Sequence, residues 1–139
     1  MLQVEIHTAI YLFVVVFMLH DFEELITVEN WAEKTNHLIK GSKNKTKLMI
    51  WKFWNINSHT FAKRDVFIFS LASSIVFLKV QFIGSNWANI LFLAFLTFVL
   101  IHNLIHILQT IILKAYTPGL YTAMILVTPY SFYLFNRLI

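Results

Sequence analysis

The residues best suited to chemistry in this 139-residue chain lie in the pentapeptide His20-Asp21-Phe22-Glu23-Glu24, which has four ionisable side chains. On a helix, His20, Glu23 and Glu24 lie on one face, because their spacing is i, i+3 and i+4. This spacing allows one helix to present several ligands to a metal ion, or a base and its partner to one substrate. Asp21 lies at the edge of that face, so we expect it to orient a ligand.

A second polar stripe lies much later in the chain. His102 and His106 are four residues apart, Gln109 continues the same stripe, and Asn103 flanks it. Two histidines at i and i+4 again have the spacing of metal ligands on one helix. We therefore expect His102 and His106 to be ligands, with Asn103 and Gln109 supporting them.

Four apolar segments have the length to carry these stripes across a bilayer. Their apolar runs are continuous, which excludes a barrel, and backbone groups in lipid must be hydrogen-bonded within the segment. Short turns at 84–86 and 116–119 predict antiparallel neighbours. The sequence thus predicts one domain over 1–139, an all-α integral membrane four-helix bundle. The expected helices cover about 6–28, 66–83, 87–113 and 120–138.

Composition agrees with a membrane chain. The sequence is 58% hydrophobic, 17% aromatic and only 13% charged, which does not describe a soluble domain. The absence of cysteine excludes disulfides, thiolate ligands and a cysteine nucleophile. The N-terminal residues 1–5 lack the basic flank of a signal peptide, so we expect the first helix to be retained.

Lysine and arginine indicate the orientation. The connection 29–65 and the turn 114–119 together contain nine of them, and the opposite side contains two. By the positive-inside rule, both stretches are cytoplasmic and both termini lie outside the cell membrane. The connection also explains the net charge of +4 as attraction to anionic lipid, so nucleic-acid binding is not needed.

Within this connection, residues 47–58 form an amphipathic pattern rich in tryptophan. The pattern predicts an additional helix lying in the cytoplasmic interface, between the first and second transmembrane helices. A lid over a site that opens on that face is the functional alternative.

The two polar stripes reach a similar depth. His20 lies fourteen residues after 6, and His102 and His106 lie fifteen and nineteen after 87. If the first and third helices run in the same direction, both stripes face one pocket in the cytoplasmic half. Two alternatives need no function: the acidic residues could be the solvated end of a tilted helix, or the histidines could only hydrogen-bond neighbouring helices.

The pentapeptide at 20–24 resembles the signature of the HXXEE family, small membrane proteins of unknown function named for that motif. The resemblance extends to a second polar helix and a Tyr-x-Pro-Gly segment, and so covers nearly the whole chain. It favours His106 over His102 as a metal ligand, and it adds Tyr116 to the supporting residues. The positions that carry this second part are Asn103, His106, Tyr116, Pro118 and Gly119.

Our leading hypothesis is a membrane-embedded metal-dependent enzyme that hydrolyses or modifies a lipid or other apolar substrate. Histidine and carboxylate ligands without cysteine favour a divalent metal ion, zinc before iron or manganese. Glu24 is the expected catalytic base, and the ligand count favours one ion over two. The expected metal ligands are His20, Glu23, Glu24, His102 and His106.

Two other functions use the same residues. The first is a proton-coupled transporter or cation pathway. Four helices with polar groups in one half offer no path across the outer leaflet, although a homodimer could supply one. The second is a non-catalytic membrane assembly protein whose buried polar network holds the helices together.

Overall fold

The computed structural model describes residues 4–139, and within that range the chain is all-α. The expectation about a signal-peptide flank depends partly on residues 1–3, which lie outside the described residues. Three long helices are followed by a final helix built from three consecutive parts. Their bounds are α1 (Ile6–Val28), α4 (Ser58–Gln81), α5 (Asn86–Leu113), and α6 (Leu120–Thr122), η2 (Ala123–Val127) and α7 (Thr128–Leu138).

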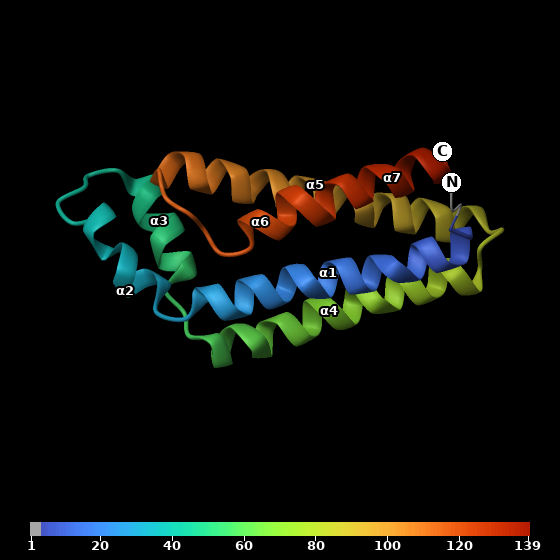
Figure 1. Ribbon diagram of the computed structural model, residues 1–139, viewed down its shortest axis with the longest axis horizontal. Helices are drawn as coiled ribbons and strands as arrows, with labels where there is room; N and C mark the ends of the chain where they lie inside the picture. The colour runs from blue at the N-terminus through green and yellow to red at the C-terminus, as the bar shows by residue number, and fades with distance from the viewer. Residues whose placement is uncertain (1–3) are drawn as a thin grey trace.

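The connection between α1 and α4 contains shorter elements. They are α2 (Trp31–Thr35), η1 (Asn36–Leu38) and α3 (Lys45–Trp54). Figure 1 shows α2 and α3 at one end of the molecule and both termini at the other.

The long helices form a bundle in which neighbours are antiparallel. Helix α1 packs against α4 and against the final helix, and α5 packs against the same two (Figure 1). Helices α1 and α5 are therefore diagonal partners that run in the same direction. Side chains from these two helices meet in the middle of the bundle, which is the arrangement that matching depths require.

Helix α4 starts earlier than the expected 66–83. The Asn57 side chain accepts a hydrogen bond from the Thr60 backbone N–H at 2.8 Å and so caps the helix before Ser58. Residues 63–65, expected to end the cytoplasmic connection, are consequently in the first turns of α4. The helix expected over 47–58 is α3, which ends at Trp54.

The final helix contains one wide turn. Pro129 has no N–H to donate to the carbonyl four residues earlier, and its ring crowds that carbonyl. The π-helical turn η2 immediately precedes α7, in which Pro129 occupies the first turn. A wider turn relieves this crowding without breaking the helix.

Apolar packing is divided into two clusters. The terminal core fills the half of the bundle near the termini, and the connection core closes the opposite end beneath α2 and α3. The buried members of the terminal core are Ala9, Ile10, Phe13, Phe17, Ala72, Ile75, Val76, Phe92, Leu96, Val99, Val127 and Leu134. Those of the connection core are Val28, Trp31, Ala32, Ile50, Trp54, Phe61 and Leu113.

Among the helices within residues 4–139, α5 is the one long and apolar enough to cross a membrane by length and composition. One such helix is weak evidence for a multi-pass membrane protein.

Candidate metal centre

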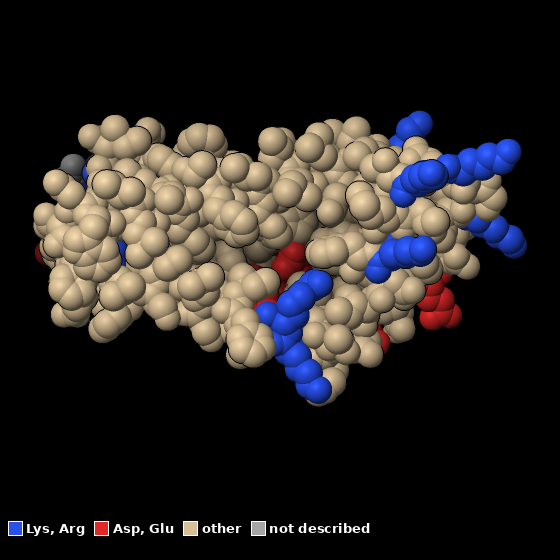
Figure 2. Space-filling model, turned by 180° about the vertical axis from the view of Figure 1, so that it is seen from behind, with Lys and Arg blue, Asp and Glu red and all other residues tan. Residues whose placement is uncertain are grey.

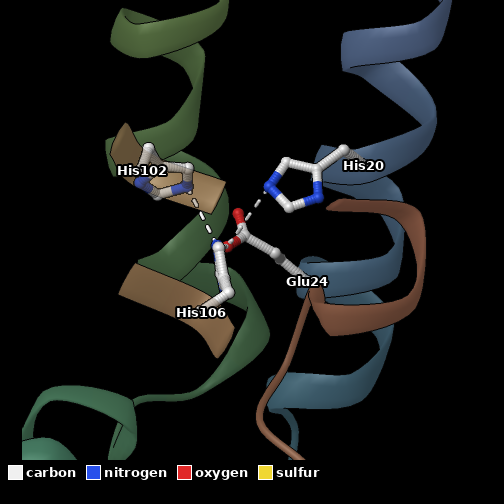
Figure 3. Close-up of side chains that lie close together, drawn as sticks. All are labelled: His20, Glu24, His102 and His106. Atoms are coloured by element: carbon white, nitrogen blue, oxygen red, sulfur yellow. Dashed lines mark hydrogen bonds and ion pairs between the residues drawn. The ribbon is translucent and has the colours of Figure 1, made fainter. Parts of the chain in front are cut away.

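Four metal-ligand side chains meet between the two diagonal helices. His20 and Glu24 come from α1, and His102 and His106 come from α5; each offers an atom within 4.8 Å of the others. Figure 3 shows the three imidazoles around the Glu24 carboxylate. His20 and His106 are 1% exposed, so this group lies in the interior of the bundle.

The donor atoms have the separations that a small divalent ion needs. His106 Nε2 lies 2.9 Å from His102 Nε2 and 3.1 Å from Glu24 Oε1, and His20 Nε2 lies 3.8 Å from that oxygen. Tetrahedral bonds of about 2.0–2.1 Å place ligand atoms about 3.4 Å apart. Small side-chain adjustments would therefore let the three imidazoles hold one ion, with the Glu24 carboxylate beside it.

The hydrogen bonds of His20 determine which of its nitrogens is free. The Thr122 hydroxyl donates to Glu23 Oε2 at 2.5 Å, so its oxygen is left to accept the proton of His20 Nδ1 at 2.9 Å. His20 Nε2 then carries a lone pair, and this atom is buried without a hydrogen-bond partner. A histidine held through Nδ1 with Nε2 free is in the form that binds a metal.

Glu23 lies on the other side of this network. Its carboxylate accepts from the Tyr116 hydroxyl at 2.5 Å, from the Tyr121 N–H at 3.2 Å, and from the Thr122 N–H at 2.6 Å. Burial and the Glu23 carboxylate raise the pKa of Tyr116, which remains a donor. The structure thus does not bring Glu23, an expected ligand, into the four-donor group: Glu23 ties the start of the final helix to α1.

Gly119 allows the turn before α6 to approach the site. It has a φ of 84°, and a Cβ there would lie 2.6 Å from Glu24 Cγ and 2.9 Å from His20 Cε1. Only glycine combines this left-handed backbone with so close an approach. The glycine of the Tyr-x-Pro-Gly segment is therefore part of the wall around the donors.

The remaining expected supporting residues contact other elements. Asn103 donates from Nδ2 to Thr128 Oγ1 at 2.9 Å and so joins α5 to the final helix. Gln109 Oε1 accepts from Trp54 Nε1 at 2.9 Å. The Trp54 ring is 2% exposed and its centre lies 5.8 Å from that of His106, so α3 covers the site from the connection end.

Asp21 belongs to a second group of carboxylates. Asp21, Glu24 and Asp65 offer oxygens that all lie within 4.8 Å of one another. Asp65 was not expected from the sequence, where it was assigned to the connection. Asp65 lies four residues after Phe61 and seven residues before Ala72, and both of these residues are buried on α4. This helical periodicity was the signal that Asp65 faces inward.

A pocket of about 360 Å³ adjoins both groups. Its polar wall includes the carboxylate group, His102 and Arg64, and Figure 2 shows acidic atoms at the bottom of a hollow beside basic side chains. The rest of its lining is apolar and comes from α1, α3, α4 and α5. These apolar residues are Phe17, Phe53, Trp54, Phe61, Ile68, Leu71, Phe95, Phe98 and Val99.

A family model described as "Protein of unknown function with HXXEE motif" matches residues 11–134. The comparison with curated proteins found no match, and no solved structure matches the chain. The family match covers the pentapeptide, both histidines of α5 and the turn at Gly119. The chain belongs to the HXXEE family, and the motif that defines this family supplies two of the four donors at the centre of the bundle.

Proposed function

We propose that this protein is a membrane-embedded, metal-dependent hydrolase acting on a lipid or similarly apolar substrate. The observation that carries the proposal is the meeting of His20, His102 and His106 at Glu24, next to an apolar pocket. Three imidazoles with one position left open are the ligand set of catalytic zinc. The donor chemistry supports zinc before iron or manganese.

The outer surface of the bundle supports a multi-pass arrangement. Large apolar side chains point outward from each long helix, among them Ile26 at 75%, Phe67 at 79% and Ile125 at 68% exposure. A water-soluble domain rarely exposes so much apolar area, whereas a bilayer requires it. By length alone, the helices of 23, 24 and 28 residues exceed the roughly 20 residues needed to span the hydrocarbon core; α5 is also apolar enough.

Charge distribution supports the orientation inferred from the sequence. Figure 2 shows basic side chains gathered toward one end of the molecule while most of the remaining surface is uncharged. The connection 29–65 contains most of the lysines and lies at the α2 and α3 end. We place this end, and with it the metal centre, toward the cytoplasm.

The residues divide the chemistry between them. The three imidazoles would hold the ion, which supplies Lewis-acid polarisation and lowers the pKa of a water. Glu24 Oε1, which lies 3.1 Å from His106 Nε2, would take the proton of the attacking water and return it to the leaving oxygen. Thr122 and Glu23 keep the His20 ring in its binding form.

The pocket supports an apolar substrate. Its aromatic and aliphatic lining ends at the donors, so a long hydrocarbon chain would lie against the lining while its polar bond reaches Glu24. Several lining residues are also exposed on the outer surface, including Leu71 and Phe98. A substrate could therefore enter sideways from the bilayer rather than from water.

Metal analysis of the chain purified in detergent without chelator tests this proposal first. We expect about one zinc per wild-type chain, and at least a tenfold loss in His20→Ala and His106→Ala. His7→Ala is the matched control, because His7 is an exposed histidine of α1, the helix that also contains His20. Metal content equal in all three variants would contradict the centre.

Activity is tested next with esters of increasing acyl length in mixed micelles. Wild-type protein should hydrolyse long-chain esters, and a chelator should abolish the reaction until zinc is restored. Glu24→Gln should lower the rate at least about 100-fold, as loss of a general base does. A rate independent of metal and unchanged by Glu24→Gln would remove the hydrolase from consideration.

The transporter alternative has less support in this fold. The terminal core separates the donors from the opposite end of the bundle, and among the described residues the buried side chains of that half are apolar except for Ser131 and Lys79. A proton path would have to cross this region. The assembly alternative leaves the unpartnered His20 nitrogen and the adjoining pocket without a role.

A further inference from the structure

Beside the histidine-rich donors lies a group that contains only oxygen ligands. Asp21, Glu24 and Asp65 come from α1 and α4 and line the same pocket. Asp21 is 4% exposed, and its Oδ2 is buried without a hydrogen-bond partner. Within residues 4–139, no basic side chain forms an ion pair with Asp21 or Asp65.

Such a group needs positive charge. Carboxylates removed from water strongly favour a neutralising partner, either a proton or a cation. Arg64 lines the same pocket, but its guanidinium lies over the rings of Phe53 and Phe61, 5.0 and 4.9 Å from their centres. Arg64 forms no ion pair with these carboxylates, so in the described part of the chain the buried Asp21 oxygen has neither a hydrogen-bond partner nor an ion-pair partner.

We propose that Asp21, Glu24 and Asp65 form a second cation site, selective for a hard divalent ion such as Mn²⁺ or Mg²⁺. Oxygen-only sites suit these ions, whereas the neighbouring imidazoles suit zinc. Glu24 belongs to both groups, so its carboxylate would lie between the two ions. This inference rests on the proposed function and deepens it: with both ions present, one oxygen of the Glu24 carboxylate would bind the second ion, and Oε1 would still take the proton of the attacking water.

A second ion would give the pocket a defined role in the reaction. Two ions beside one carboxylate can stabilise both the attacking and the leaving oxygen of a displacement. The second site lies on the pocket side of Glu24, since Asp65 comes from α4 and lines the pocket. A substrate with a phosphoryl or carboxyl ester next to a hydrocarbon chain fits this charge arrangement best.

The test is a titration of zinc-loaded protein with Mn²⁺, followed by electron paramagnetic resonance of bound manganese and metal analysis of the same sample. Wild-type protein should bind one Mn²⁺ without releasing zinc. Asp65→Asn should keep zinc and bind Mn²⁺ at least tenfold more weakly, and His102→Ala should lose zinc. Glu33→Gln, which changes an exposed acidic residue, should behave as wild type.

The outcomes separate this inference from the proposed function. Zinc binding with no saturable Mn²⁺ site, or equal Mn²⁺ binding by Asp65→Asn and Glu33→Gln, would overturn the second site and leave the zinc centre intact. Saturable Mn²⁺ binding that requires Asp65 in a protein that never retains zinc would support the second site and contradict the zinc centre. Asp21→Asn repeats the test on the other helix if Asp65→Asn does not fold.

Discussion

The same helices pack in two different ways in the two halves of the bundle. In the terminal core, Phe13 lies against Phe17, Phe92 and Phe95 with ring centres 5.8–6.2 Å apart, and its side chain is fully buried. In the other half, the same helices α1 and α5 place three imidazoles and the Glu24 carboxylate in the space between them. The terminal half is filled by aromatic and aliphatic side chains, and among the described residues its buried polar atoms without partners are the hydroxyls of Ser73 and Ser131. The other half contains the imidazole, carboxylate and amide atoms that are buried without partners.

This difference indicates where stability and function reside. Buried polar atoms without partners destabilise a fold, and buried charged groups are costly unless they have a partner. The terminal core can offset that cost because its packing is continuous across α1, α4, α5 and the final helix. We therefore expect substitutions in the terminal core to change stability. Substitutions in the half that contains His20, Glu24, His102 and His106 should change ligand binding.

The largest expected effect on stability comes from Phe13→Ala. Removal of a fully buried aromatic ring leaves a cavity, and such substitutions cost about 3–5 kcal/mol. The unfolding midpoint in detergent should fall clearly, while the folded fraction binds as much zinc as the wild type does in the same assay. Phe67→Ala is the control, because Phe67 is 79% exposed. Loss of zinc from folded Phe13→Ala would show that the two halves are not independent.

Gly119→Ala should affect both stability and the site. A non-glycine residue in the left-handed region costs about 1–2 kcal/mol, and the new Cβ would also meet Glu24 Cγ at 2.6 Å. The matched control is Gly41→Ala, because Gly41 has a similar φ of 77° with no heavy atom within 4 Å of the added Cβ. Unfolding should be easier in both variants, and zinc affinity should fall only in Gly119→Ala.

Thr122→Val tests metal affinity with a smaller change to the fold. Valine keeps the shape but removes the hydroxyl that connects Glu23 to His20 Nδ1. Loss of a group that orients a ligand typically weakens metal binding 10–100-fold. Competition with a chromophoric chelator measures this change. Thr97→Val, at an exposed threonine bonded to its own helix, should leave the affinity unchanged.

The smallest effect is expected at the connection. The Ser58 N–H donates to Glu29 Oε2 at 2.7 Å and lowers the pKa of Glu29 in the folded state. A lowered folded pKa stabilises the fold above the unfolded value of 4.5, and this contribution disappears as the pH falls through the folded value. Unfolding midpoints of wild type and Glu29→Gln should differ slightly at pH 7 and converge at pH 3. A difference that persists at pH 3 would contradict this origin.

The sequence predicted much of the helical scaffold because apolar length is a local property. Helix α1 has the expected bounds 6–28, and α5 begins one residue before the expected 87. The start of α4 was not predicted, since its charged first turns resemble a connection until the Asn57 cap is recognised. The all-α fold and the HXXEE family are confirmed, and the four-span membrane topology stays a prediction.

The sequence by itself determined that His20 and Glu24 share a face of one helix, and that His102 and His106 share a face of another, because helical spacing depends only on position in the chain. Only the tertiary structure decided which neighbouring groups these faces meet. The turn at Gly119 brings Thr122 to Glu23, which removes Glu23 from the donors, and α4 brings Asp65 to Asp21. Such contacts depend on the diagonal placement of α1 and α5 and on how closely their neighbours approach, which no local pattern specifies.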